Sequence, residues 1–325
     1  MNSITRRLTR FLVFGLFFLL ITSLFIGRYP IPDQINQIFS NQLFTNLILR
    51  VRIPRILFGI LVGFGLASSG MIMQSIFKNP LAEPGLLGVN QAAGFGAALG
   101  ILAFDNSYFM VQILAFIFGI ISITLTIFLS NNTKKKERLS LVLAGISVSA
   151  LFSAGLGIIK YIADPVDQLP SIVFWLLGSL SNSNWTSLLQ ISPIIVTCLL
   201  LLYFYRWRLN VFSLDREVLF SMGLRNELEL VIILMISVLL TTSIISLSGI
   251  IGWVGLIIPN IARVITGQNT KYSLPISMIL GGIFVLVSDN IARALLPGEI
   301  PLGIITAFLG AVIFIILLLT KKEIL

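Results

Sequence analysis

An acid and a base four residues apart, Asp289 and Arg293, lie within the apolar run 273–296 and could do chemistry there. An ionisable group inside a membrane span is a candidate for a proton or ion relay. The same spacing puts both side chains on one helical face with the acid first, the order that favours a structural ion pair. A proton-coupled carrier would need more buried acids than this run offers, which favours the structural pair and leaves the relay as the alternative.

Several catalytic chemistries are excluded by what the sequence lacks. It has no histidine, which excludes zinc-hydrolase motifs and histidine-based acid–base catalysis. Its single cysteine, Cys198, lies in an apolar run and offers neither a disulfide framework nor a thiolate metal cluster. No G-x-x-x-x-G-K-[ST] occurs, so the chain has no P-loop for a nucleotide. We therefore expect neither an enzyme nor a bound cofactor or metal.

The stretch "KNPLAEPGLLGV" (78–89) interrupts two apolar runs with charged, amide and proline residues. Pro80 and Pro84 each fix φ and remove a backbone donor, which stiffens the turn. Irregular backbone is tolerated near a bilayer only where protein or water covers it. The sequence therefore predicts a rigid, functional turn at a membrane edge. The alternative is a plain connection between two helices.

The segment 206–228 is the longest inner connection, and part of it can form a short amphipathic helix. Its apolar residues Leu214, Val218, Leu219 and Met222 fall at helical spacing, and Gly223 supplies a C-terminal stop. Such a helix is too polar to insert into a membrane. It either packs on the membrane surface or docks with a cytoplasmic subunit.

Composition identifies the solvent in which these segments fold. The 325-residue chain is 57% hydrophobic and only 11% charged, whereas soluble domains carry about 25% charged residues. We therefore expect a polytopic all-α membrane protein that contacts lipid. In a membrane protein the net charge of +9 indicates the orientation of the loops that carry it. Nucleic acid is therefore not expected as a partner.

Runs of roughly 20 apolar residues predict about ten transmembrane helices in a single transmembrane domain, residues 1–325. "GILVGFGLASSG" and "GAALG" within them place small residues where helix backbones can approach closely. The piece 170–180 is too short to cross and is expected to be a partial or interfacial helix. The ten expected spans are 11–27, 56–77, 86–104, 108–130, 139–161, 186–205, 229–248, 251–266, 273–296 and 301–320.

Positive charge sets the orientation, because Lys and Arg mark cytoplasmic loops. With the N-terminus inside, sixteen of the 22 Lys and Arg lie on the cytoplasmic side, so both termini are expected there. The first run could instead be a signal peptide, but it is long and lacks a small-x-small cleavage site. The cations left outside are Arg28, Arg50, Arg52, Arg55, Lys160 and Arg293.

Six motifs in order make the chain resemble permeases of the FecCD family, the membrane subunits of type II ABC importers for iron-siderophores, haem and vitamin B12. They reach from about residue 50 to residue 318. One departure is Asn260, where many members have histidine. The motifs are "RIPR" (52–55), "SSGMIMQSIFKNPLAEPGLLGV" (68–89), "LNVFSLDREVLFSMG" (209–223), "GIIGWVGLIIPNIAR" (249–263), "SDNIAR" (288–293) and "GEIPLGIITAFLGAVIFIILL" (298–318).

This resemblance implies an assembly in the bacterial cytoplasmic (inner) membrane. A second permease subunit, identical or not, would complete a dimer with the substrate path between the copies. Two cytoplasmic ATP-binding subunits would use ATP and Mg²⁺, and an extracytoplasmic binding protein would deliver the ligand. The expected cargo is an iron-siderophore complex, with vitamin B12 or haem as alternatives. A self-powered secondary carrier and a membrane-embedded enzyme are alternatives of other classes.

The resemblance also assigns roles to particular residues. Asn79, Pro80 and Leu81 would form part of a cytoplasmic gate, and the segment from 209 to about 227 would couple to the ATPase. Arg52, Arg55 and Arg293 would dock acidic residues of the binding protein, unless Arg293 only pairs with Asp289 and Arg55 anchors its span at the headgroups. The expected coupling residues are Leu214, Glu217, Val218, Leu219, Met222 and Gly223.

Overall fold

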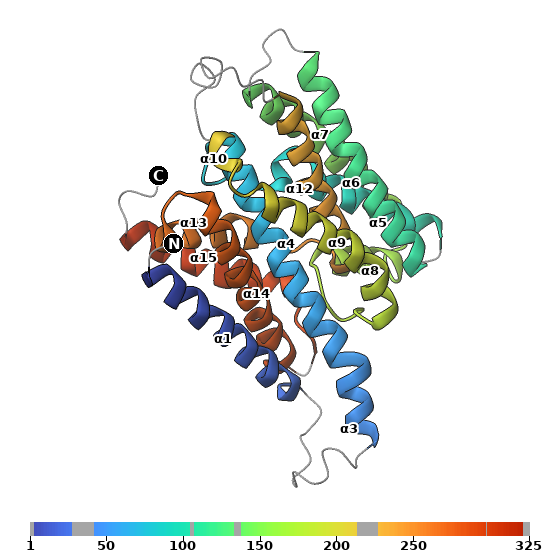
Figure 1. Cartoon of the computed structure of the whole chain (residues 1–325). Coiled ribbons are helices and arrows are strands. Elements are labelled where there is room, and N and C mark those ends of the chain that lie inside the picture. The colour runs from blue at the N-terminus through green and yellow to red at the C-terminus, as the bar shows by residue number, and fades with distance from the viewer. Residues whose placement is uncertain are drawn as a thin grey trace.

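The computed structural model describes residues 3–27, 42–104, 107–132, 138–212, 227–296 and 298–320. Every regular element within these ranges is a helix (Figure 1). In chain order they are α1 (Ser3–Phe25), α3 (Gln42–Leu47), the π-helical turn η1 (Ile48–Arg52), α4 (Ile53–Phe77), the 3₁₀ turn η2 (Pro84–Leu87), α5 (Val89–Ala103), α6 (Tyr108–Asn131), α7 (Arg138–Ile162), α8 (Gln168–Leu176), α9 (Trp185–Tyr205), α10 (Leu209–Phe212), α12 (Glu227–Ser248), α13 (Val254–Thr266), α14 (Thr270–Ala294) and α15 (Leu302–Thr320).

The all-α membrane-spanning fold expected from the sequence is confirmed. Eight helices in the described ranges are long and apolar enough to cross a membrane, and α5 and α13 are shorter apolar helices. One continuous helical stretch, Gln42–Phe77, joins α3, η1 and α4. It begins well before residue 56, where the sequence predicted the second span. Pro54 does not interrupt it, because this proline lies in the first turn of α4, where a missing backbone N–H is tolerated.

Helix α4 runs through the middle of the bundle and packs against α13 and α14 (Figure 1). Glycines allow the backbones to touch. A Cβ added at Gly63 would lie 2.2 Å from the carbonyl oxygen of Gly281, and one added at Gly70 would lie 1.8 Å from that of Gly255. Close backbone approach through small residues is a recurring mode of helix association in membranes. These three helices therefore form the core of the chain.

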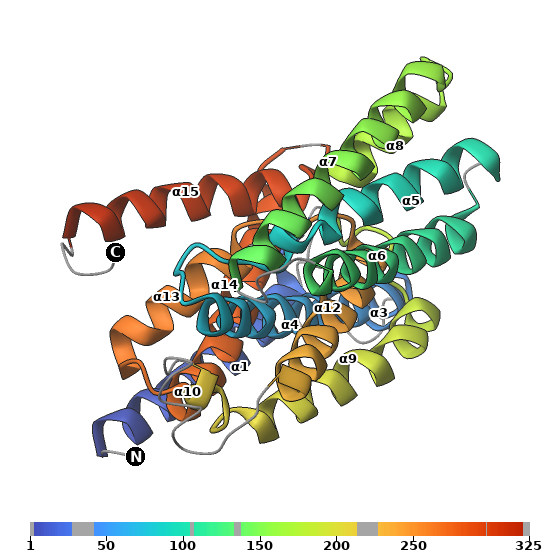
Figure 2. The same cartoon turned by 90° about the horizontal axis from the view of Figure 1, so that it is seen from above.

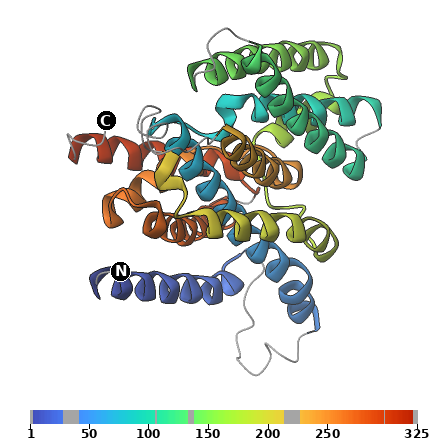
Figure 3. The same cartoon turned by 45° about the horizontal axis from the view of Figure 1, so that its top comes forward.

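Helix α1 lies at the edge of the bundle, where it contacts mainly α14 (Figure 3). Figure 2 shows α7 and α15 on the side of the bundle opposite α1. Both α7 and α15 leave many large apolar side chains uncovered, including Leu151, Ile158, Phe308 and Leu319. Lipid or a second membrane subunit must cover these faces, because apolar surface of this extent does not stay in water.

The chain is not helical between α12 and α13. Backbone groups here and at the end of α8 bond to one another and to the start of α15. Gly178 and Gly249 adopt left-handed φ values of 69° and 68°. The Ser179 amide donates to the Ser248 carbonyl at 2.7 Å, and the Leu302 amide donates to the Gly178 carbonyl at 2.8 Å. We call the meeting of 177–179, 248–250 and 301–303 the backbone junction. It ties the end of α8, the end of α12 and the start of α15.

Candidate functional site

The loop 78–88, which joins α4 to α5, has an ordered and exposed tip. Lys78 ends α4 in a left-handed conformation, with φ 49°. The Asn79 side-chain oxygen accepts the Leu81 amide at 2.9 Å, and its carbonyl accepts the Ala82 amide at 3.1 Å. These two bonds close a tight turn that leaves Asn79 exposed and the Leu81 side chain 42% exposed. The tip thus presents an amide and an apolar side chain at one end of the bundle.

The base of this loop is buried and held by α6 and α7. The Thr126 hydroxyl of α6 donates to the Leu87 carbonyl at 3.2 Å. A Cβ at Gly145 of α7 would lie 2.2 Å from the Leu86 carbonyl oxygen, so α7 passes directly against the loop. Burial raises the pKa of the Glu83 carboxyl in the loop, because a low-dielectric site disfavours the charged form. The loop is therefore a fixed base carrying a short exposed tip.

Helix α13 reaches the tip through Asn260. The Asn260 side-chain amide donates to the Pro80 carbonyl at 3.0 Å and to the Leu256 carbonyl of its own helix at 2.9 Å. Asn260 is buried. The sequence singled out Asn260 as a departure from the family pattern but did not predict this bond, because nothing local relates it to Pro80.

The expected coupling residues Leu214, Glu217, Val218, Leu219, Met222 and Gly223 lie outside the described residues. The structure describes the chain on both sides of this segment. Arg208 and Glu229, which flank it, form a bidentate ion pair with contacts of 2.8 and 2.7 Å. This pair brings the two ends of segment 209–227 together.

The short helix α10, immediately before the undescribed segment, is tied to two distant helices. The Asn210 side-chain oxygen accepts from the Thr270 amide at 2.9 Å, and its amide donates to Asn269 at 3.0 Å. The Arg138 guanidinium, at the start of α7, donates to the Phe212 carbonyl at 2.8 Å. Helix α10 is therefore anchored to the first turns of both α14 and α7.

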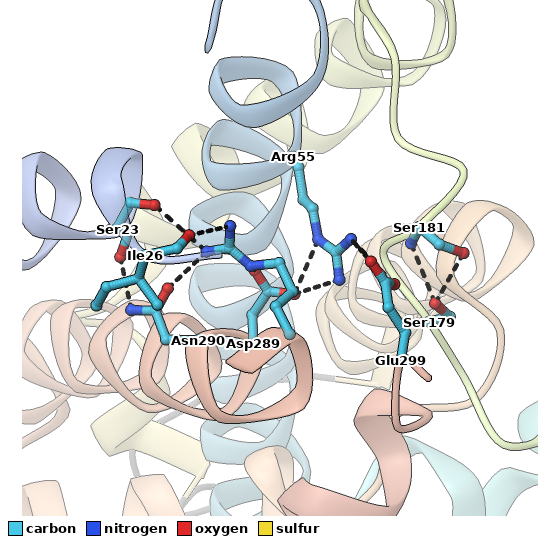
Figure 4. Close-up of polar contacts among 9 residues, drawn as sticks. Ser23, Ile26, Arg55, Ser179, Ser181, Asp289, Asn290 and Glu299 are labelled. Atoms are coloured by element: carbon cyan, nitrogen blue, oxygen red, sulfur yellow. Dashed lines mark hydrogen bonds and ion pairs between the residues drawn. The ribbon is translucent and has the colours of Figure 1, made fainter. Parts of the chain in front are cut away.

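A cluster of arginines and acids occupies the opposite end of α4 and α14 (Figure 4). Arg55 donates to Asp289 at 2.8 and 3.0 Å and to Glu299 at 2.9 and 3.1 Å. Arg293 lies 2.9 Å from the other oxygen of Asp289. Asp289 is fully buried, whereas the Glu299 side chain is 32% exposed. Two guanidiniums therefore compensate one buried carboxylate, and a second carboxylate closes the cluster toward the surface.

The same cluster fixes α1 to the bundle (Figure 4). Arg293 donates to the Ile26 carbonyl at 3.0 Å, and Asn290 donates to the Ser23 hydroxyl at 2.7 Å. Arg52 donates to the Leu24 carbonyl at 2.5 Å. The bonds from Arg293 and Arg52 satisfy carbonyls at the end of α1, which have no partner within the helix.

The three outer arginines make structural contacts within this chain, and their docking to a binding protein stays a prediction. Arg52, Arg55 and Arg293 are 4%, 6% and 6% exposed, and each is bonded to groups of this chain. The expectation that Arg55 anchors a span at the headgroups is wrong, because Arg55 lies within the helix and is paired with two acids. The structural pair of Asp289 and Arg293 is confirmed. The link from Arg55 to both acids was not predicted.

A cavity of about 400 Å³ opens between α5, α6, α8 and α12, next to the backbone junction. Hydroxyl, amide and aromatic groups line its walls, among them Tyr108, Ser171, Trp175 and Asn182. None of the described residues that line it carries a charge. The cavity therefore offers hydrogen bonds and aromatic surface without a charge that would select an anion or a cation.

Comparison with known proteins places this geometry in a family. The family model described as the FecCD transport family matches residues 15–320. A solved structure described as an inward-facing conformation of a putative metal-chelate type ABC transporter is 37% identical. The match covers 97% of this chain and 100% of the chain in that structure, with a TM-score of 0.90.

Curated relatives cover nearly the whole chain. The molybdate import system permease protein MolB of Haemophilus influenzae is 38% identical, with 96% of each chain covered. A probable iron chelatin transport system permease protein of Helicobacter pylori is 37% identical over 85% of this chain and 83% of its own. The hemin transport system permease protein HmuU of Yersinia pestis is 34% identical over 87% and 86%. Their names describe different cargoes, so similarity alone does not choose among them.

Proposed function

Because the chain belongs to the FecCD transport family of ABC importer permeases, we propose that it carries an iron-siderophore complex across the inner membrane. The observation that supports a metal chelate most directly is the near-complete likeness to a transporter described as of metal-chelate type. The uncharged lining of the cavity next to the backbone junction also suits a chelate whose metal charge is masked by its ligand. Recognition of the particular ligand then falls to an extracytoplasmic binding protein.

A second candidate cargo is molybdate. The relative named for molybdate import covers 96% of this chain. Hydroxyl groups such as those of Tyr108 and Ser171 in the same cavity can donate hydrogen bonds to an oxyanion without carrying charge. Haem is supported by the hemin permease relative, and vitamin B12 remains an alternative from the motif resemblance alone.

Uptake by the reconstituted importer tests the cargo. The chain would be placed in proteoliposomes with its ATP-binding subunits and binding protein, and offered radioactive ferric hydroxamate, ferric citrate, haemin, molybdate or cyanocobalamin. We expect ATP-dependent accumulation of a ferric chelate, at least about tenfold above the rate without ATP. Accumulation of molybdate alone would replace the first candidate by the second. Uptake that persists without ATP-binding subunits would identify a secondary carrier instead.

We propose that the gate and coupling residues of this chain have the roles that the family resemblance implies. Asn79, Pro80 and Leu81 would narrow the cytoplasmic mouth of a path shared with a second permease subunit. The segment 209–227 would fit the ATP-binding subunit, which hydrolyses ATP with Mg²⁺. The ion pair of Arg208 with Glu229 supports this assignment, because it holds the two ends of the segment together.

Charge reversal or helix breaking in the proposed coupling segment should separate ATP hydrolysis from transport. We expect Glu217→Arg or Gly223→Pro to lower ATP-driven uptake about tenfold or more, since a short helix must present one face and one end to its partner. Co-purification of the ATP-binding subunit and its hydrolysis rate would be measured beside uptake. Leu228→Ala, an exposed position next to the segment, serves as the control. Normal attachment and normal uptake in both variants would refute the coupling role.

A further inference from the structure

We infer that Asn260 is a positioning residue that links the proposed cytoplasmic gate to the helix corner between α13 and α14. This inference rests on the gate assignment of the proposed function and adds the element that moves or holds the gate. The Asn260 amide bridges two carbonyls, that of Leu256 within α13 and that of Pro80 in the loop tip. The Pro80 carbonyl therefore keeps its place relative to α13 and not only relative to α4.

Pro259 explains why a backbone carbonyl of α13 is available to a neighbouring helix at this point. Proline has no amide hydrogen, so Pro259 leaves the Gly255 carbonyl without its donor in the helix. Gln74 of α4 contributes its side-chain amide, 2.9 Å from the Leu256 carbonyl and 3.4 Å from that of Gly255. The carbonyl freed by Pro259 is thus turned toward α4. Asn260 follows directly, where its side chain reaches the loop.

Arg263 extends the connection by one further turn. Its guanidinium donates to the side-chain oxygen of Gln74 and to the Met71 carbonyl of α4. Two turns of α13 are consequently bonded to the last two turns of α4, immediately before the loop. In a low-dielectric interior such bonds are strong and costly to break. A shift of α13 along its axis therefore has to carry Pro80 with it.

The other end of α13 is connected to α10. Gly267, with φ 83°, ends the helix, and Asn269 caps α14 by accepting the Lys271 amide at 3.0 Å. Asn210 of α10 bonds both Asn269 and Thr270. A continuous chain of bonds thus runs from α10, beside the proposed coupling segment, through the corner 267–270 and α13 to Pro80. Asn260 is its last contact before the loop tip.

Spin labelling tests the positioning directly, without a transported ligand. Leu81→Cys would be labelled in a Cys198→Ala background, with the chain assembled with its ATP-binding subunits. Asn260→Asp replaces the amide donor by a carboxylate that faces the Pro80 carbonyl, and we expect the label to gain mobility. Asn260→His keeps a ring N–H that can donate, and we expect it to restore the wild-type spectrum. Thr266→Val, which removes a bond confined to α13, should change nothing.

The uptake assay then shows whether this position matters for coupling. We expect Asn260→Asp to lower the amount transported per ATP by about tenfold, because the gate no longer follows the ATP-driven movement. ATP hydrolysis should be retained, and Asn260→His should behave close to wild type. A wild-type spectrum and a wild-type ratio in Asn260→Asp would overturn the inference. Failure of the gate assignment looks different. In that case the label gains mobility in Asn260→Asp while the transported amount per ATP stays unchanged.

Discussion

Asp289→Asn is expected to destabilise the chain by about 3–5 kcal/mol, because it leaves two buried guanidiniums without their shared counter-charge. Arg55 points at this carboxylate (Figure 4), and Arg293 lies 2.9 Å from its other oxygen. Burial keeps water from replacing the carboxylate. The amide of asparagine can still accept one hydrogen bond but carries no charge. The expected result is a lower thermal-unfolding midpoint in detergent and a smaller monodisperse fraction on size exclusion.

Two further variants test whether charge is the cause. Glu299→Gln removes the other acid, which is 32% exposed, and solvent screening should hold its cost to about 1 kcal/mol or less. Asp289→Leu combined with Arg293→Met removes an acid and a base together, and such replacements of buried pairs are often neutral. We expect this double variant to be more stable than Asp289→Asn. If Asp289→Asn unfolds at the wild-type temperature, the cluster does not hold the outer end together.

Gly70→Ala is expected to prevent native packing of the core. The added methyl carbon would lie 1.8 Å from the Gly255 carbonyl oxygen. Neither atom can rotate away, because the helix backbones of α4 and α13 fix both positions. Helices α4 and α13 would have to separate, which breaks the Gln74 and Arg263 contacts described above. We expect a loss of about 3 kcal/mol or more, at the upper end for overpacked cores. Folded yield and unfolding temperature measure it.

A matched substitution shows whether space or helix propensity decides this outcome. Gly15 lies in α1 with nothing within 4 Å of an added Cβ. Gly15→Ala should therefore leave stability unchanged or raise it by up to about 1 kcal/mol, the intrinsic preference of a helix for alanine. Equal behaviour of Gly15→Ala and Gly70→Ala would mean that the two helix backbones are not in contact.

The sequence was sufficient for those features that depend on local pattern. Apolar run length predicted the helices, and the spacing of Asp289 and Arg293 predicted their ion pair. The break at 78–89 was recognised from its prolines and charges. Each of these signals lies within one helix or one loop.

Contacts between distant segments could not be predicted in this way. Arg55 and Asp289 are 234 positions apart, and Asn260 and Pro80 are 180 apart. Only the packing of α4 against α13 and α14 brings these groups together, and that packing depends on glycine pairs whose partners no single segment reveals. Arg55 therefore looked like a headgroup anchor, because its two acidic partners could not be placed from the sequence. The docking role came from the family resemblance and stays a prediction.

The backbone junction has a consequence for how the chain is inserted as it is synthesised. Helix α13 has 13 residues, about 20 Å of helix, which is too short for a bilayer core of about 30 Å. Its irregular approach, together with 177–179, carries peptide groups that lipid cannot satisfy. Two of those carbonyls, of Gly178 and Leu177, receive their donors from Leu302 and Gly303. Helix α8 therefore leaves the translocon with two carbonyls that lack donors, and α15, which is translated more than 120 residues later, supplies them.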